Sequence, residues 1–166
     1  DVRGLRWWEE LRLEKGGEAL SILAVPARHA HDDALNAELG TVNGYLLRHS
    51  GPRGGFTVYW TGDTVWFDGV AEIRGRAGRV DLLVPHLGAV GADGPYGRMT
   101  LDGEEGARLV ELFGEAAVIP VHHHTFSHYV EPVERLVEHV APGSRPRLVV
   151  LAEGGEWEAP ARTNEP

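Results

Sequence analysis

The sequence lacks cysteine altogether and carries a single methionine among its 166 residues. Without cysteine, the chain can form no disulfide, no thiolate metal site and no cysteine nucleophile. No apolar run approaches the roughly 20 residues that span a bilayer, and no signal peptide opens the chain. Stable membrane insertion is therefore not expected, and a cytoplasmic location is.

Positive charge is also scarce. Lys and Arg number 16 against 25 Asp and Glu, which gives a formal charge of −9. The arginines are scattered and form no basic stripe that could displace phosphate counterions. Nucleic-acid binding and attachment to an anionic membrane surface are therefore disfavoured, whereas a metal held by nitrogen and oxygen ligands stays compatible with the composition.

The chain itself reads as strands first and then as strands alternating with helices. Alternating apolar residues and turn residues predict strands at 20–25, 41–48 and 56–61. Further along, strands are expected at 80–84, 116–119 and 148–151, and helices at 65–73, 100–113 and 133–140. This order predicts an α/β or α+β layered fold. The length is that of one domain, residues 1–156, followed by a tail, 157–166.

Local signals refine these boundaries. Paired glycines predict a hairpin turn at 15–18, and the polar, aperiodic segment 30–40 is expected to be a loop. A glycine-rich loop is expected at 88–97. Thr100 is expected to cap the helix after it, whose first turn is favourably acidic at Glu104 and Glu105.

Three potential metal ligands follow predicted strands. His29, Asp63 and His122 each come just after a buried strand with a sharp exit, so a layered sheet would gather them along one edge. Imidazole and carboxylate suit zinc, manganese or iron, and a metal so bound can present hydroxide as a nucleophile. The alternative is that the histidines are capped core or surface residues and that Asp63 caps the helix after it.

The remaining histidines and glycines carry weaker signals. Adjacent residues cannot all point the same way, so His122, His123 and His124 supply at most one or two ligands. His123, His124 and His128 are interpreted as contacting the ligands or the substrate, with plain surface exposure as an equal alternative. A structural role is preferred for the other histidines, namely His31, His49, His86 and His139. No Gly-x-Ser-x-Gly elbow surrounds Ser127, and the glycines of 88–97 form no phosphate-binding fingerprint.

An ordered series of motifs is similar to a known family. The motifs are Trp7-Trp8-Glu9-Glu10, Pro26-Ala27-Arg28-His29, Gly44-Tyr45-Leu46-Leu47, Tyr59-Trp60-Thr61-Gly62-Asp63-Thr64, Val80-Asp81-Leu82-Leu83-Val84-Pro85, Met99-Thr100 and Ile119-Pro120-Val121-His122. In that order they resemble the second half of metallo-β-lactamase-fold hydrolases. The likeness is strongest to the branch that holds the ascorbate-phosphate lactonase-like and N-acylphosphatidylethanolamine phospholipase D-like proteins.

The resemblance implies the second half of a four-layer αββα sandwich and a pair of divalent metal ions, preferentially zinc with manganese or iron as alternatives. It assigns His29 to the first metal site, Asp63 to the bridging carboxylate and His122 to the second site. Asp63 and His122 would serve catalysis, and Thr64 would support them. The implied activity is hydrolysis of an ester, lactone or phosphodiester bond of a small molecule by a metal-bound hydroxide.

One departure from the family is large. Its first ligand motif, His-x-His-x-Asp-His, occurs nowhere in these residues. The sequence is therefore expected to be a fragment of a longer protein, with a degenerate, noncatalytic binding or scaffold protein as the alternative. With ligands for both sites incomplete, the polypeptide alone is expected to bind divalent metal poorly and to show no turnover. The loop 88–99, with His124 and His128, would shape the pocket.

Overall fold

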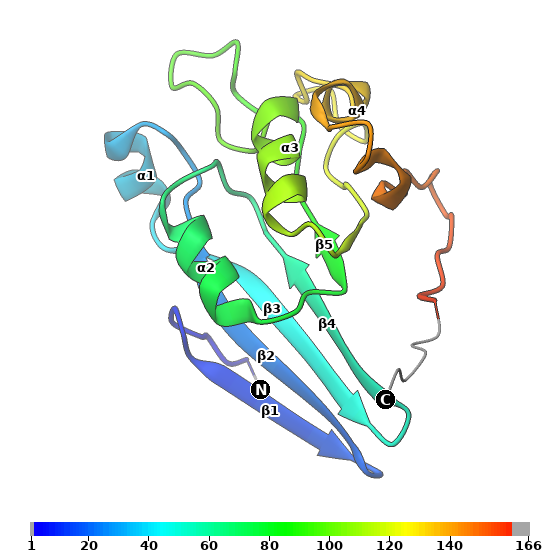
Figure 1. Cartoon of the computed structure of the whole chain (residues 1–166). Helices are drawn as coiled ribbons and strands as arrows, with labels where there is room; N and C mark the ends of the chain where they lie inside the picture. The colour runs from blue at the N-terminus through cyan, green and yellow to red at the C-terminus, as the bar shows by residue number, and fades with distance from the viewer. Residues whose placement is uncertain (1, 161–166) are drawn as a thin grey trace.

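The computed structural model describes residues 2–160 and shows one six-stranded sheet in the order β1-β2-β3-β4-β5-β6 (Figure 1). The strands are β1 (Glu10–Lys15), β2 (Glu18–Ala27), β3 (Val42–Gly51), β4 (Gly54–Trp60), β5 (Leu82–Val84) and β6 (Ala117–Val118). Strands β1 to β4 pair antiparallel in succession, and β5 and β6 run parallel to β4. Strands β2, β4, β5 and β6 therefore share one direction, and their carboxyl ends meet at one edge.

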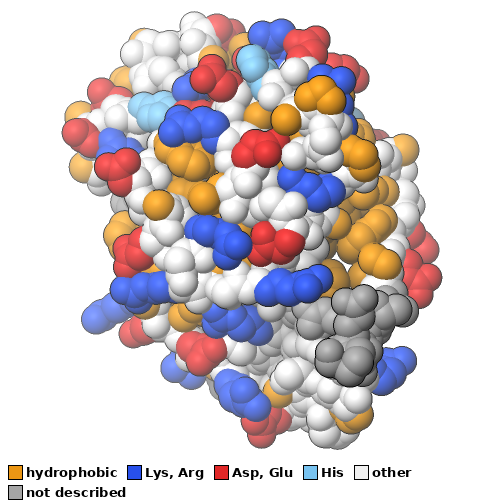
Figure 2. Space-filling model, in the orientation of Figure 1, with side chains coloured by type: hydrophobic (Ala, Val, Ile, Leu, Met, Phe, Trp, Pro, Cys, Tyr) orange, Lys and Arg blue, Asp and Glu red, His pale blue; other side chains and the backbone are white. Residues whose placement is uncertain are grey.

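Helices α2 (Gly69–Ala77) and α3 (Gly103–Leu112) lie together over one face of the sheet (Figure 1). The other helices are α1 (Asp33–Leu39), α4 (Glu134–His139) and the short 3₁₀ helix η1 (Arg145–Arg147). A mixed sheet carrying helices confirms the predicted fold class. On the face seen in Figure 2, acidic and basic side chains are interspersed.

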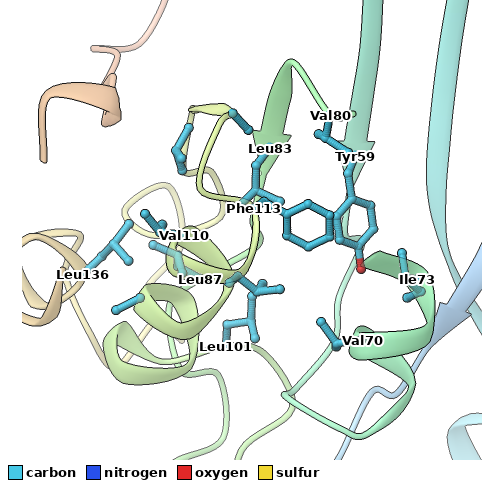
Figure 3. Close-up of a cluster of buried hydrophobic side chains, with 14 of the residues drawn as sticks. Tyr59, Val70, Ile73, Val80, Leu83, Leu87, Leu101, Val110, Phe113 and Leu136 are labelled. Atoms are coloured by element: carbon cyan, nitrogen blue, oxygen red, sulfur yellow. The ribbon is translucent and has the colours of Figure 1, made fainter. Parts of the chain in front are cut away.

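The core lies between the sheet and helices α2 and α3. Tyr59 of β4 meets Phe113, at the end of α3, with ring centroids 5.2 Å apart, and Ile73 of α2 closes the cluster from the other side (Figure 3). All three side chains are almost fully buried. Burial raises the pKa of the Tyr59 phenol, so this group stays neutral and acts as a packing residue.

The opposite face of the sheet is also apolar. One row of aliphatic side chains crosses it in register, each partly exposed: Leu11, Ile22, Leu47, Val58 and Leu82. Since successive side chains of a strand alternate between faces, this row stands opposite the buried cluster. The sheet thus resembles the middle layer of a layered α/β fold.

The structure confirms the turn at 15–18 and corrects other predicted elements. Residues 30–40 hold helix α1, capped by Asp32, whose carboxylate accepts from the Leu35 amide; no residue of α1 is buried, so its sequence carries no apolar periodicity. Helix α2 begins at Gly69 rather than at residue 65. Residues 148–151 form no strand, because the two-residue β6 offers Leu148 only an isolated bridge to Val118. Of the predicted tail, residues 161–166 lie outside the described range.

The predicted cap of helix α3 is also wrong. Asp102, not Thr100, caps the helix, and its Oδ1 accepts from the Glu105 amide at 2.8 Å. The Thr100 hydroxyl instead donates to the Leu87 carbonyl at 2.9 Å and accepts from the Val90 amide. Thr100 therefore pins the glycine-rich loop rather than the helix.

Candidate metal centre

The candidate ligands lie where the strands of common direction end. His29 follows β2, Asp63 follows β4 and His122 follows β6. A fourth residue, His86, follows β5 and forms a parallel bridge with Val121. The structure thus brings together the three side chains that the sequence placed at strand ends, and it adds His86, to which the sequence gave a structural role.

Two imidazoles face the same carboxylate. Nε2 of His29 lies 3.8 Å from Oδ2 of Asp63, and Nε2 of His122 lies 3.7 Å from Oδ1. Both separations are too long for a hydrogen bond. They match the spacing of roughly 3 to 4 Å between two atoms that bind one cation at about 2.0 to 2.2 Å each. Each carboxylate oxygen therefore faces a different imidazole at a distance suited to a shared ion.

The other ring nitrogen of each imidazole is held by the backbone. Nδ1 of His29 lies 2.9 Å from the Met99 carbonyl, and Nδ1 of His122 lies 3.2 Å from the Leu87 carbonyl. A carbonyl can only accept, so Nδ1 carries the proton and Nε2 of the neutral ring keeps its lone pair. This arrangement orients histidines that bind metals. The donor set therefore fits a divalent cation.

His86 is bonded differently. Its Nδ1 donates to Asp63 Oδ1 at 2.8 Å, and its Nε2 accepts from the Trp60 indole at 2.5 Å. The ligand atoms of Asp63, His86 and His122 all lie within 4.8 Å of one another, which makes His86 a further possible ligand. With both ring nitrogens engaged, however, His86 acts in this structure as the group that holds the carboxylate.

These contacts keep Asp63 ionised. The hydrogen bond from His86 is the main reason that the pKa of Asp63 lies below its ordinary value; burial opposes it, and His122, His86 and His29 lower it further when their rings carry a proton charge. The carboxylate is therefore deprotonated at neutral pH and presents acceptors only.

The backbone at His122 is unusual. This residue has a φ of 62°, a left-handed conformation that is strained for a residue other than glycine. Its carbonyl approaches Gly88 so closely that a Cβ at that glycine would lie 2.6 Å from the oxygen. His122 stacks on His86 with centroids 5.3 Å apart and packs against Tyr129 at 4.6 Å. The strained turn places the imidazole beside Asp63.

The other predicted residues surround this centre. Thr64 is buried, and its hydroxyl accepts from the Arg28 amide, which ties the exit of β4 to that of β2. His123 is buried, and its pKa is lowered mainly by that burial. His124 lies on His123, and the ring of His128 lies 6.4 Å from that of His122. None of these three has a contact with Asp63 of the kind made by His29, His86 and His122.

The sequence did contain a signal for His86. This residue follows the buried strand β5 and Pro85, much as His29 and His122 follow their own strands. Strand direction, rather than local sequence, decides that all these exits share an edge. A search for histidines that come just after a buried strand and a sharp turn would therefore have included His86.

Comparison with known proteins gives a consistent result. Residues 1–123 match the family model of the beta-lactamase superfamily domain. A UPF0173 metal-dependent hydrolase of Thermococcus kodakarensis is 28% identical over 141 residues, 85% of this chain and 56% of the relative. Its counterpart in Chloroflexus aurantiacus is 35% identical over 119 residues, 71% of this chain and 44% of the relative. The chain thus spans about half the length of these relatives.

Solved structures share the fold. The isothiocyanate hydrolase from Delia radicum gut bacteria aligns with a TM-score of 0.73 at 23% identity, over 93% of this chain and 58% of that one. Igni18, a metallo hydrolase from Ignicoccus hospitalis, aligns with a TM-score of 0.62 at 22% identity, over 93% of this chain and 58% of that one. At such identities the likeness concerns the fold alone.

Proposed function

The chain belongs to the beta-lactamase superfamily domain family, and from this premise we propose that it carries the reaction centre of a metal-dependent hydrolase. The observation that supports the proposal most directly is the pair of imidazole Nε2 atoms that face the two oxygens of Asp63 at 3.7 and 3.8 Å. The metal-dependent hydrolase names of the relatives agree with it.

Each side chain has a defined part in this proposal. His29 and His122 would each supply Nε2 to a divalent cation, while backbone carbonyls fix their Nδ1 protons. Asp63 would bind through either oxygen or bridge two ions, and His86 would orient that carboxylate. When bound, the cation would act as a Lewis acid and lower the pKa of water toward neutrality. Imidazole and carboxylate ligands suit zinc, manganese and iron, of which we propose zinc.

A small molecule with an apolar substituent is the proposed substrate. The segment 121–130, which follows the centre, contains no Asp, Glu, Lys or Arg. From His122 the rings continue through Tyr129 to Phe126, whose centroid lies 5.8 Å from that of Tyr129 and whose side chain is exposed. Uncharged rings beside the centre favour an ester, lactone or phosphodiester with an apolar substituent.

For the whole protein we propose a longer domain, of which residues 1–156 supply the second half. The partly exposed aliphatic row on β1 to β5 supports a second sheet packed there, as in an αββα sandwich. We retain the similarity to the lactonase-like and phospholipase D-like branch as part of this proposal. The further ligands for a pair of metal ions would come from a His-x-His-x-Asp-His motif in the first half.

A zinc titration tests the centre directly. Zinc held by Asp63, His29 and His122 alone is expected to dissociate on dialysis, so calorimetry or NMR titration is the suitable measurement. Asp63→Asn and His29→Ala should weaken zinc binding, whereas His49→Ala, at an exposed hairpin position, should not. Equal affinity in the three variants would contradict the proposal.

Activity is a second, independent measurement. A panel of an ester, a lactone and a phosphodiester, assayed with the longer protein and the same substitutions, would identify the bond that is cleaved. A noncatalytic scaffold is not favoured, since the relatives bear hydrolase names. Zinc binding without hydrolysis of any panel member by the longer protein would revive that alternative.

A further inference from the structure

Glu105 is a buried carboxylate outside the centre described above. It lies in the first turn of α3, and its side chain is 7% exposed. Its amide donates to the cap residue Asp102, and its carboxylate contacts other segments of the chain. A buried carboxylate that lacks partners is strongly destabilising, so its contacts indicate what it does.

The carboxylate joins three connections of the chain. Oε1 lies 2.7 Å from Nε2 of His31 and accepts from Nη2 of Arg98 at 3.0 Å. Oε2 accepts from the backbone amide of Trp66 at 3.2 Å. His31 belongs to the connection from β2 to α1, Trp66 to that from β4 to α2, and Arg98 to that from β5 to α3.

The same connections carry the candidate ligands or the groups that orient them. His29 precedes His31, and Asp63 precedes Trp66. Met99, next to Arg98, provides the carbonyl that accepts from Nδ1 of His29 at 2.9 Å. A displacement of Arg98 would therefore displace the acceptor that aims the His29 ring.

Further contacts make this linkage stiff. Arg98 also pairs with Asp102, the cap residue of α3. The amide of Met99 donates to the Val90 carbonyl at 2.7 Å. This bond helps to fix the carbonyl of Met99 in the loop. Charge-assisted hydrogen bonds such as that between Arg98 and Glu105 are stronger than neutral ones.

We propose that Glu105 is a positioning residue: by clamping His31, Trp66 and Arg98, it holds the Met99 carbonyl against Nδ1 of His29 and so aims Nε2 of that ring at Asp63. The effect of Glu105 on metal binding rests on the proposed function. The structural part of the proposal, the restraint of the His29 ring, can be measured without metal.

The test compares Glu105→Gln with Glu104→Gln. Both remove one carboxylate from the first turn of the same helix, but Glu104 is exposed. Nitrogen NMR reports whether the His29 proton resides on Nδ1 and how fast it exchanges with water. In Glu105→Gln we expect faster exchange and a mixture of ring tautomers, with no such change in Glu104→Gln. Arg98→Gln, which removes one arm of the clamp, should resemble Glu105→Gln.

Zinc titration supplies the second measurement. Loss of groups that orient ligands typically lowers metal affinity about 10- to 100-fold, and we expect a change of this size in Glu105→Gln and Arg98→Gln but not in Glu104→Gln. Circular dichroism and thermal melting identify any variant that fails to fold, in which case Arg98→Gln carries the test. An unchanged His29 signal in folded Glu105→Gln or Arg98→Gln would overturn the proposal. A changed His29 signal in a protein that binds no zinc would uphold the clamp and refute the proposed function instead.

Discussion

Two carboxylates, Asp63 and Glu105, show what distinguishes a ligand from a structural anchor in this fold. Glu105 is 7% exposed and meets its donors at 2.7 to 3.2 Å. Asp63 is 37% exposed, and besides the hydrogen bond from His86 it faces two imidazole nitrogens at 3.7 and 3.8 Å. The first group is satisfied by protein donors, whereas the second keeps acceptor capacity for a cation.

Among the substitutions considered, Asp63→Asn should have the largest effect on zinc affinity. The amide has lost the negative charge that attracts a cation, so we expect zinc affinity to fall by at least about 100-fold, more than for the loss of an orienting group. Calorimetric titration measures the change. The thermal midpoint should move little, since the side chain is partly exposed. If the Asn variant binds zinc as well as the parent does, Asp63 is not a metal ligand and has only a structural role, like Glu105.

Glu105→Ala should have the largest effect on folding. Breaking a buried ion pair leaves its partners without compensation and costs about 3 to 5 kcal/mol. We expect a reduction near the lower end, because the side chain of Arg98 is 28% exposed and can recruit water. Urea denaturation measures the free energy of unfolding. Glu104→Ala is the matched control, and equal losses in both variants would show that burial of Glu105 contributes nothing.

His86→Gln should change the pH response of Asp63. Because the pKa of Asp63 is lowered in the folded protein, its contribution to stability is present above the unfolded pKa and is lost as the pH falls through the folded pKa. Removing the main cause should raise the folded pKa and shrink that contribution. Carbon NMR titration of the Asp63 carboxyl group follows the pKa, and an unchanged value would assign the lowering to His29 and His122.

Phe126→Ala should have the smallest effect. If its ring contacts an apolar substituent of the substrate, the loss of one aromatic contact should raise KM roughly three- to tenfold and leave kcat nearly unchanged. The measurement requires the proposed longer protein and an ester that carries a phenyl group. Leu13→Ala removes another exposed apolar side chain, in β1 near the hairpin turn at 15–18, and should leave KM unchanged. Equal effects would argue against a specific contact.

The sequence predicted the centre better than it predicted the clamp. Strand patterns placed His29, Asp63 and His122 at strand exits, and common strand direction brought the exits to one edge. The acidic first turn of α3 was visible, but nothing local showed that Glu105 meets Arg98 and His31. Those contacts depend on how distant connections pack, which neither propensity nor periodicity records.

The errors in the fold have the same origin. Helix α1 buries no residue, so it carries no apolar period, and its local signals were the cap at Asp32 and the glycine at its end, Gly40. Residues 148–151 are apolar enough for a strand, but β6 is too short to pair with them. In both cases the local sequence was interpreted without the segments that pack against it. Those segments decide whether a local preference for helix or strand is realised.

The mixed sheet also has a consequence for the order of folding. The meander β1 to β4 is built from sequence neighbours joined by two tight turns and one connection that holds α1, whereas β5 and β6 must close longer crossovers before they can pair. Local pairings form faster than distant ones. We therefore expect the meander to gain protection first in pulsed hydrogen exchange. Asp63 follows β4, the last strand of the meander, whereas His122 follows β6. His122 would therefore reach Asp63 only in the last stage of folding.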